Sequence, residues 1–434
     1  MSDVAIGFSG LGVLLVLLAL RTPIGVALIA VSFGGLWVLM GWRVAWGALG
    51  TLPFQFAANW VLSSVPMFLL LGFICYHTRL TEGLFAAARL WLGRLPGGLG
   101  VAAIAGSAGF AAVSGSSIAC SATMGRIAVP EMVKGRYDPG FATGIVAVAG
   151  TIGALIPPSI IMILFGIVAQ ESIAALFLAG IAAGVITALA YALLVIVRVR
   201  LNPRLAPPAA VHATRRQKLA ALRDTWPIAA TMVGIFAGLF GGIFTPTEAG
   251  AVGAALATLV ALVRGSFTRA RFAAAVTETL MATGMLLFVA VGASLLTRFL
   301  ALSGASDALS RLLIGTDVPF ALMMLGLVLV YLVLGMFLEP IGAMLLTLPV
   351  VLPVVEAYGM SPILFGVVLT KLLEIGMLTP PVGMNVFVIK SVVGGLVPVQ
   401  AIFRNVAVFI VVDLAIVALL IAVPGLALWL PGHL

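Results

Sequence analysis

The chain has 434 residues, of which 63% are hydrophobic and only 9% are charged, and its formal net charge is +9. Soluble domains carry about 25% charged residues, so this composition excludes a soluble globular protein. In a membrane protein, Lys and Arg mark the side of the membrane on which loops lie. We therefore attribute the positive charge to topology and expect no nucleic-acid partner.

Apolar stretches long enough to cross a bilayer begin at the N-terminus, since a crossing helix needs about 20 such residues. No small-residue cleavage site follows the first stretch, so we predict a membrane span there and not a signal peptide. One segment of the first half, residues 97–125, is predicted not to cross. Five spans are predicted in this half, near residues 4–20, 22–41, 59–77, 141–169 and 174–197.

A basic stretch then separates two apolar halves. Residues 198–223 carry seven Lys and Arg residues and three prolines, without an acidic residue. We divide the chain into a first repeat at 1–200, a cytoplasmic basic linker at 201–223 and a second repeat at 224–434. The second half has its own non-crossing segment, 319–352, and five predicted spans, near residues 226–243, 246–263, 277–297, 362–389 and 402–422.

Placing the linker in the cytoplasm sets the orientation of every span, because cytoplasmic loops collect Lys and Arg. Both termini then face the periplasm. On this topology 19 of the 23 Lys and Arg residues lie on the cytoplasmic side, three lie on the other side, and Lys371 lies within a span. The split would be poorer if residues 97–125 crossed the membrane, which favours the non-crossing assignment.

The two halves match each other when the second is shifted by 223 residues. Prolines recur in register, as at Pro130 and Pro353, and residues 152–158 (IGALIPP) match residues 375–381 (IGMLTPP). If the match came only from shared hydrophobicity, Leu and Val would recur in register, and not prolines and glycines. Because each half has an odd number of spans, the second half must run in the opposite direction, as in many secondary transporters. The predicted fold is an all-α polytopic membrane protein with two inverted-topology repeats, each of five spans plus one re-entrant hairpin.

The chemistry of a transporter is expected where helices break near the middle of the bilayer, because unwound backbone supplies ligands there. Two such places are the predicted hairpin tips, and two more are proline pairs inside long spans, since adjacent prolines remove backbone donors and free carbonyl oxygens. The tips supply the candidate residues Ser114, Gly115, Ser116, Ser117, Glu339 and Pro340. The breaks supply Thr151, Gly153, Pro157, Pro158 and Ser159, and Glu374, Gly376, Thr379, Pro380, Pro381 and Asn385.

Freed carbonyls and hydroxyls are hard oxygen ligands that suit an alkali cation such as Na⁺. Its expected positions lie near Ser116, Thr151, Gly153, Gly376 and Thr379. The hydroxyls, Asn385 and the positive ends of half-helices suit an anionic solute. Structural interpretations stay open: small residues also allow close helix packing, and a proline pair can be only a kink. Lys371, one turn before Glu374, can form an ion pair with it or act directly.

Four segments, in order along the chain, resemble the large membrane subunit of TRAP transporters, of the DctM/SiaM type. They are residues 114–117 (SGSS), 150–159, 242–249 (GIFTPTEA) and 374–385. The resemblance covers essentially the whole chain. It implies a Na⁺-coupled importer of a small organic acid anion, such as a C4-dicarboxylate or sialic acid, in the bacterial inner membrane.

The resemblance also implies partners and a motion. Besides the lipid bilayer, the partners would be a small four-helix membrane subunit, expected as a separate chain, and a periplasmic solute-binding protein that delivers the solute. The motion would be elevator-like, with hairpins and broken helices moving against a scaffold. The expected scaffold consists of the spans near 4–41, 174–197, 226–263 and 402–422, so that residues 245–249 would support packing.

Two alternatives differ from this interpretation. A stand-alone carboxylate transporter of a related elevator fold would need no binding protein, and uptake by this chain alone would identify it. An integral-membrane enzyme would need a cluster of His, Asp or Cys near one face. The chain has only three scattered histidines and two separate cysteines, so the sequence favours a transporter over an enzyme.

Overall fold

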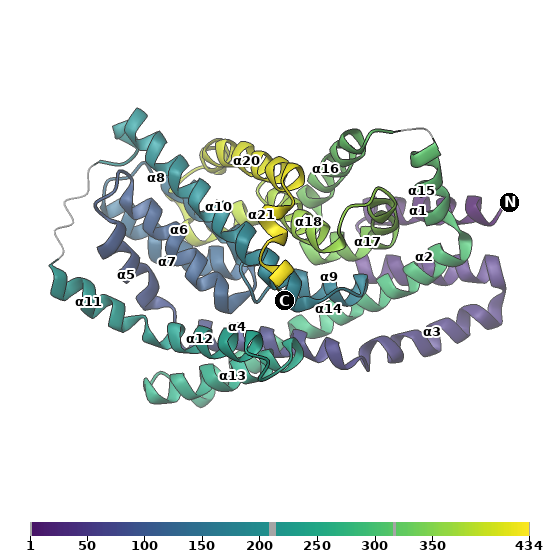
Figure 1. The fold of residues 1–434 in the computed structure, drawn as a ribbon, viewed down its shortest axis with the longest axis horizontal. Coiled ribbons are helices and arrows are strands. Elements are labelled where there is room, and N and C mark those ends of the chain that lie inside the picture. The colour runs from purple at the N-terminus through teal and green to yellow at the C-terminus, as the bar shows by residue number, and fades with distance from the viewer. Residues whose placement is uncertain (1, 208–213, 316–317, 434) are drawn as a thin grey trace.

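The computed structural model describes residues 2–207, 214–315 and 318–433, and these residues form helices and the turns that join them (Figure 1). The helices before the linker are α1 (Asp3–Ala19), α2 (Ile24–Met40), α3 (Trp42–Ala57), α4 (Ser64–His77), α5 (Glu82–Leu92), α6 (Gly98–Ser114), α7 (Ser117–Lys134), α8 (Pro139–Gly150), α9 (Ile160–Ala169) and α10 (Ile173–Leu201). The later helices are α11 (Arg215–Asp224), α12 (Trp226–Phe240), α13 (Pro246–Val263), α14 (Arg269–Ser303), α15 (Ala305–Gly315), α16 (Phe320–Phe337), α17 (Pro340–Ala357), α18 (Pro362–Gly376), α19 (Met384–Val393), α20 (Val399–Ala422) and α21 (Gly425–Leu428). Short 3-10 turns are η1 (Trp60–Ser63), η2 (Thr151–Ala154), η3 (Pro203–Leu205), η4 (Gly394–Leu396) and η5 (Pro431–His433).

Lipid-facing surfaces account for the apolar composition. Within the described ranges, seven helices are long and apolar enough to cross a membrane. On α10, Leu189 and Leu193 are 65% and 62% exposed, whereas Tyr191 and Val195 on another face are buried. Large exposed apolar faces of this kind mark contact with lipid. The chain is therefore an all-α polytopic membrane protein, as predicted.

Both segments that were predicted not to cross are helical hairpins. In the first, α6 and α7 meet at Gly115, whose φ of 59° lies in the left-handed region that favours glycine. In the second, α16 and α17 meet at Leu338 and Glu339. The second arms run farther than predicted, to Lys134 and Ala357. α16 and α17 are also among the long apolar helices, and a hairpin returns the chain to its starting side whether its arms cross or stop half-way.

Both proline pairs interrupt their spans, as predicted. α8 is followed by the short turn η2 and by non-helical residues up to Ser159, before α9 begins. α18 ends at Gly376, and α19 begins only at Met384. The Pro157-Pro158 and Pro380-Pro381 peptide bonds are both cis. Both ends of α17 lie 223 positions after those of α7, and α18 begins 223 positions after α8, the shift at which the two halves of the sequence match.

The helices pack in two groups. In the first, α2 lies against α1, α3 and α14, and α13 lies against α4 and α12. In the second, the hairpin α6–α7 packs with α8, α8 with α19 and α20, and α18 with α10 and α20. In Figure 1 the helices α12, α13 and α3 follow the lower edge of the molecule, and α10, α18 and α20 lie above them.

The spans that form α10 and α20, which were expected to belong to the scaffold, pack with the second group of helices. Tyr191 and Val195 of α10 and Phe409 of α20 belong to one buried cluster with Phe141 and Ile145 of α8. The buried faces of α10 and α20 therefore pack against the broken helices. Chain order did not reveal this, because it does not tell which element a buried face contacts.

Several helices occur where no span was predicted. α3, α5 and α15 are too short or too polar to stand out as spans, and α5 buries Phe85 and Ala87 while Trp91 is exposed. α11 lies inside the predicted linker, where Thr214 and Gln217 form a capping box at its start. Residues 208–213 of the linker, with Pro208, lie outside the described residues.

Candidate functional site

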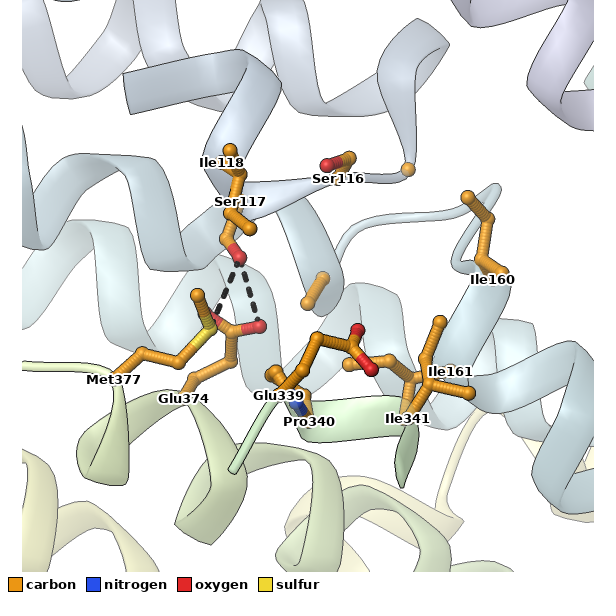
Figure 2. Close-up of a pocket in the computed structure, with 12 residues that line it drawn as sticks. Ser116, Ser117, Ile118, Ile160, Ile161, Glu339, Pro340, Ile341, Glu374 and Met377 are labelled. Carbon is orange, nitrogen blue, oxygen red and sulfur yellow. Dashed lines mark hydrogen bonds between the residues drawn. The ribbon is translucent and has the colours of Figure 1, made fainter. Parts of the chain in front are cut away.

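A small pocket lies where the two hairpin tips meet the two helix breaks (Figure 2). Taken as the space open to the centre of a water molecule, its volume is about 50 Å³, which holds an ion or a few water molecules. It is lined by Gly115, Ser116, Ser117 and Ile118 of the first hairpin, Glu339, Pro340 and Ile341 of the second, and Ala154, Ile160, Ile161, Glu374 and Met377 of the breaks. Six of the candidate residues thus come together at one place.

Three helices begin at this pocket. α7, α9 and α17 are capped by Ser116, Ser159 and Glu339, whose side chains accept hydrogen bonds from backbone N–H groups of the first turn at 3.4, 3.3 and 3.0 Å. A helix N-terminus carries about half a positive charge, and its N–H groups bind anions. The three N-termini therefore contribute positive potential to the pocket, which a list of its side chains does not reveal.

Two carboxylates line the same pocket. Glu374 is 1% exposed, and its Oε1 accepts a hydrogen bond from Ser117 Oγ at 3.0 Å, with Met377 Sδ 3.6 Å from the same hydroxyl (Figure 2). Glu374 Oε2 has no hydrogen-bond partner in the described part of the chain. Glu339 is exposed, so the pocket opens to the surface. No Lys or Arg among the described residues lines the pocket, so the lining is suited to binding a cation.

Two glycines allow the first hairpin tip to sit against the first break. A Cβ on Gly115 would lie 2.5 Å from the Pro158 carbonyl oxygen, and a Cβ on Gly153 would lie 3.0 Å from the Ser116 carbonyl oxygen. Because these neighbours are backbone atoms, they cannot move aside as a flexible side chain can. Close packing against backbone atoms thus explains why both positions are glycine, independently of any role in ion binding.

The other candidate residues surround the pocket without lining it. Thr151 and Thr379 each donate, at 2.7 Å, to a backbone carbonyl oxygen of the helix that precedes them, at Val148 of α8 and Ile375 of α18. Asn385 is fully buried, and neither polar atom of its side chain has a partner within the described ranges. The candidates outside the pocket lining are Ser114, Thr151, Gly153, Pro157, Pro158, Ser159, Gly376, Thr379, Pro380, Pro381 and Asn385.

Comparison with known proteins identifies the family. The family model described as "Tripartite ATP-independent periplasmic transporter, DctM component" matches residues 11–426. The chain belongs to the DctM family. It is 32% identical over 382 residues to the C4-dicarboxylate TRAP transporter large permease protein DctM of Pseudomonas aeruginosa, with 88% of each chain covered. It is 31% identical over 375 residues to the sialic acid TRAP transporter large permease protein SiaM of Vibrio cholerae, with 86% of each covered.

The fold also resembles a solved structure, that of the Alcanivorax borkumensis YdaH transporter. The TM-score is 0.58 at 17% sequence identity, over 91% of this chain and 89% of that chain. At this identity the likeness supports the fold alone. The family match makes the DctM chain a TRAP transporter large permease subunit and a multi-pass inner-membrane protein. It also excludes the integral-membrane enzyme.

In this DctM protein, Lys371 has a different partner from the one considered in the sequence. Its Nζ donates to Asp413 Oδ1 at 2.5 Å, and it is not paired with Glu374. Tyr191 OH donates to the same carboxylate, 2.7 Å from each oxygen, and lies 3.3 Å from Thr151 Oγ1. A buried polar network therefore connects the first break, through α10 and α20, to the helix that leads to the second break.

Sequence reasoning missed Tyr191 and Asp413. Asp413 could have been found, because a single acidic residue inside an apolar span is costly and defaults to a functional interpretation. Tyr191 carries no such signal, since its side chain is uncharged. Its role depends on the packing of α10 against α20, which the sequence did not predict.

The GIFTPTEA motif starts a helix. Thr245 caps α13, and Glu248 Oε2 accepts hydrogen bonds from the Thr245 backbone N and Oγ1 at 2.8 and 2.9 Å. This reciprocal arrangement is a capping box. The motif lies in the first packing group of the DctM protein, in keeping with the predicted supporting role.

Proposed function

We propose that this DctM family member imports a small organic acid anion together with Na⁺, and that the hairpin tips and helix breaks hold both. One observation carries the proposal: a single pocket combines the N-termini of α7, α9 and α17 with the carboxylates of Glu339 and Glu374. N-termini attract an anion, and carboxylates attract a cation. A pocket of this size with both features can hold the cation beside the carboxylate group of the solute, whose remaining atoms would lie outside it.

The solute is expected to be a carboxylate. Its charge would be met by N–H groups of the first helical turns and by the Ser116 and Ser117 hydroxyls. Two carboxylates beside an anion would repel it, so bound Na⁺ would be needed to offset them. This requirement supplies a physical reason for coupling: the anion binds well only after the cation. The relatives' C4-dicarboxylate and sialic acid are the first solutes to test.

The proposed sodium ligands extend beyond the pocket lining. Ser116, Thr151, Gly153, Gly376 and Thr379 remain the proposed positions. Residues 155–159 and 377–383 lie outside regular helix, and carbonyls of broken turns are suitable ligands. Side-chain oxygens of Ser114, Glu374 and Asn385 without a partner among the described residues add capacity for a cation nearby.

The partners and the motion follow from the proposed role. A periplasmic solute-binding protein would deliver the anion, and a small four-helix membrane subunit would complete the complex. The two packing groups support an elevator-like motion, in which the hairpins, the broken helices, α10 and α20 move against α1–α4 and α12–α14. Exposed apolar faces, such as that of α16, provide surface for lipid and for the small subunit.

The test is uptake into proteoliposomes that contain this chain and the small subunit, with the cognate binding protein outside. C4-dicarboxylates, sialic acid and other organic acids are compared under an inward Na⁺ gradient, an inward proton gradient and neither. We expect uptake of one acid, only with the binding protein and only with the Na⁺ gradient.

Other results would overturn parts of the proposal. Equal uptake under a proton gradient alone would contradict sodium coupling. Uptake by this chain without the two partners would identify the stand-alone transporter considered above. Ligand identification on the binding protein narrows the panel of acids before the uptake measurement.

A further inference from the structure

The ion pair between Lys371 and Asp413 lies one helical turn from the pocket carboxylate Glu374. Asp413 of α20 accepts hydrogen bonds from Lys371 Nζ at 2.5 Å and from Tyr191 OH at 2.7 Å on each oxygen. The side chains of Lys371 and Asp413 are each 1% exposed. Both oxygens of Asp413 thus have partners, and the ammonium group is directed toward α20.

A second carboxylate is within reach of the same lysine. Lys371 and Glu374 stand three residues apart on α18, a spacing that places two side chains on the same face of a helix. An ammonium group has three donors, so Glu374 is the natural acceptor for Lys371 in the absence of Asp413. In the structure, Glu374 accepts from Ser117 instead, and its Oε2 has no partner in the described part of the chain.

An ammonium group on Glu374 would do what the transported cation is proposed to do. It would neutralise the carboxylate and occupy Oε2, the oxygen without a partner in the described part of the chain. We propose that Asp413 is a positioning residue: it holds Lys371 away from Glu374 and so keeps that carboxylate available to the transported cation. This inference rests on the proposed cation coupling and gives a role to a pair of residues outside the pocket.

The test measures Na⁺ binding directly, without a transported solute. The purified complex of this chain with its small subunit is unfolded by heat at rising NaCl, with choline chloride keeping the ionic strength constant. A cation that binds the folded protein raises its unfolding temperature, so the NaCl concentration that gives half of the maximal rise reports the affinity. In the Asp413→Asn variant we expect this concentration to rise by about tenfold or more, because opposite charges attract strongly in a buried site.

The double variant Lys371→Met/Asp413→Asn separates positioning from simple structural support. It lacks the ammonium group that would compete, so we expect its half-maximal NaCl concentration to return to near the wild-type value. If Asp413 acted only by supporting the fold, the double variant would remain as impaired as Asp413→Asn. If Asp413→Asn does not assemble, the double variant still tests the proposal by itself. A raised half-maximal NaCl concentration in the double variant contradicts the proposal.

Two further variants serve as controls. Asp413→Glu keeps a carboxylate for Lys371 and is expected to bind Na⁺ much like the wild type. Tyr191→Phe removes the hydroxyl from the network but leaves the ion pair, so its NaCl requirement should change far less than that of Asp413→Asn. An equal change in Tyr191→Phe would assign the effect to the network as a whole and overturn the role of Asp413.

The outcomes distinguish this inference from the proposed function. A wild-type complex that responds identically to NaCl and choline chloride overturns sodium coupling and this inference with it. A wild-type complex that responds to NaCl, with an unchanged response in Asp413→Asn, overturns this inference alone.

Discussion

The close contact between α16 and α18 allows a quantitative prediction. A Cβ on Gly335 would lie 2.7 Å from Gly376 Cα, and one on Gly376 would lie 2.5 Å from Gly335 Cα. Carbon atoms pack best at about 3.5–4.0 Å, so Gly335→Ala must separate the two helices by about 1 Å. Gly376 is the last residue of α18, and the separation would therefore act directly at the second break.

Overpacking of this kind costs about 1–3 kcal/mol. We expect Gly335→Ala to lower the unfolding temperature of the purified complex and to reduce Na⁺-driven uptake. Gly326→Ala is the matched control, because Gly326 is exposed on the same helix and a Cβ there meets nothing within 4 Å. Replacing a helical glycine by alanine contributes about 1 kcal/mol of helix propensity, so the control should be neutral or slightly stabilising. If Gly335→Ala proves as stable as Gly326→Ala, the close approach of α16 and α18 is wrong.

Three further predictions concern the breaks and the motif that precedes α13. Ser116→Ala and Thr151→Val should abolish Na⁺-dependent uptake while the complex still assembles, as judged by co-purification of the small subunit; unchanged sodium dependence in both would remove them from the ion site. Replacement of Pro380-Pro381 by two alanines should favour a continuous helix and stop transport, and normal uptake by that variant would show that the proline pair is only a kink. Thr245→Ala should destabilise the complex by about 1 kcal/mol through loss of the helix cap and leave the Na⁺ requirement of uptake unaltered; a changed Na⁺ requirement would contradict its purely supporting role.

The breaks and hairpin tips could be predicted because their causes are local. A proline pair removes donors wherever it stands in a span, so Pro157-Pro158 and Pro380-Pro381 predict their breaks without tertiary information. The hairpin tips could be predicted for the same reason, because Ser116 and Glu339 cap the helices that follow them directly in the sequence. Local chemistry of this kind also explains why the 223-residue shift is visible in prolines and glycines.

The pairing of charges could not be predicted because it depends on which faces meet. Lys371 has Glu374 beside it in the sequence but Asp413 beside it in space. The difference arises from the packing of α18 against α20, which chain order does not specify. For the same reason the sequence did not predict that α10 and α20 pack with the second group of helices.

The length of α14 has a consequence for how the protein sits in the bilayer. Its 35 residues make a helix about 52 Å long, whereas the hydrocarbon core is about 30 Å thick. Even at a tilt of about 40°, near the upper end of the usual range, the helix would still extend about 40 Å along the membrane normal. α14 must therefore protrude into the headgroup region or the water. The helix can therefore still span a bilayer whose hydrocarbon core is several ångström thicker than the average.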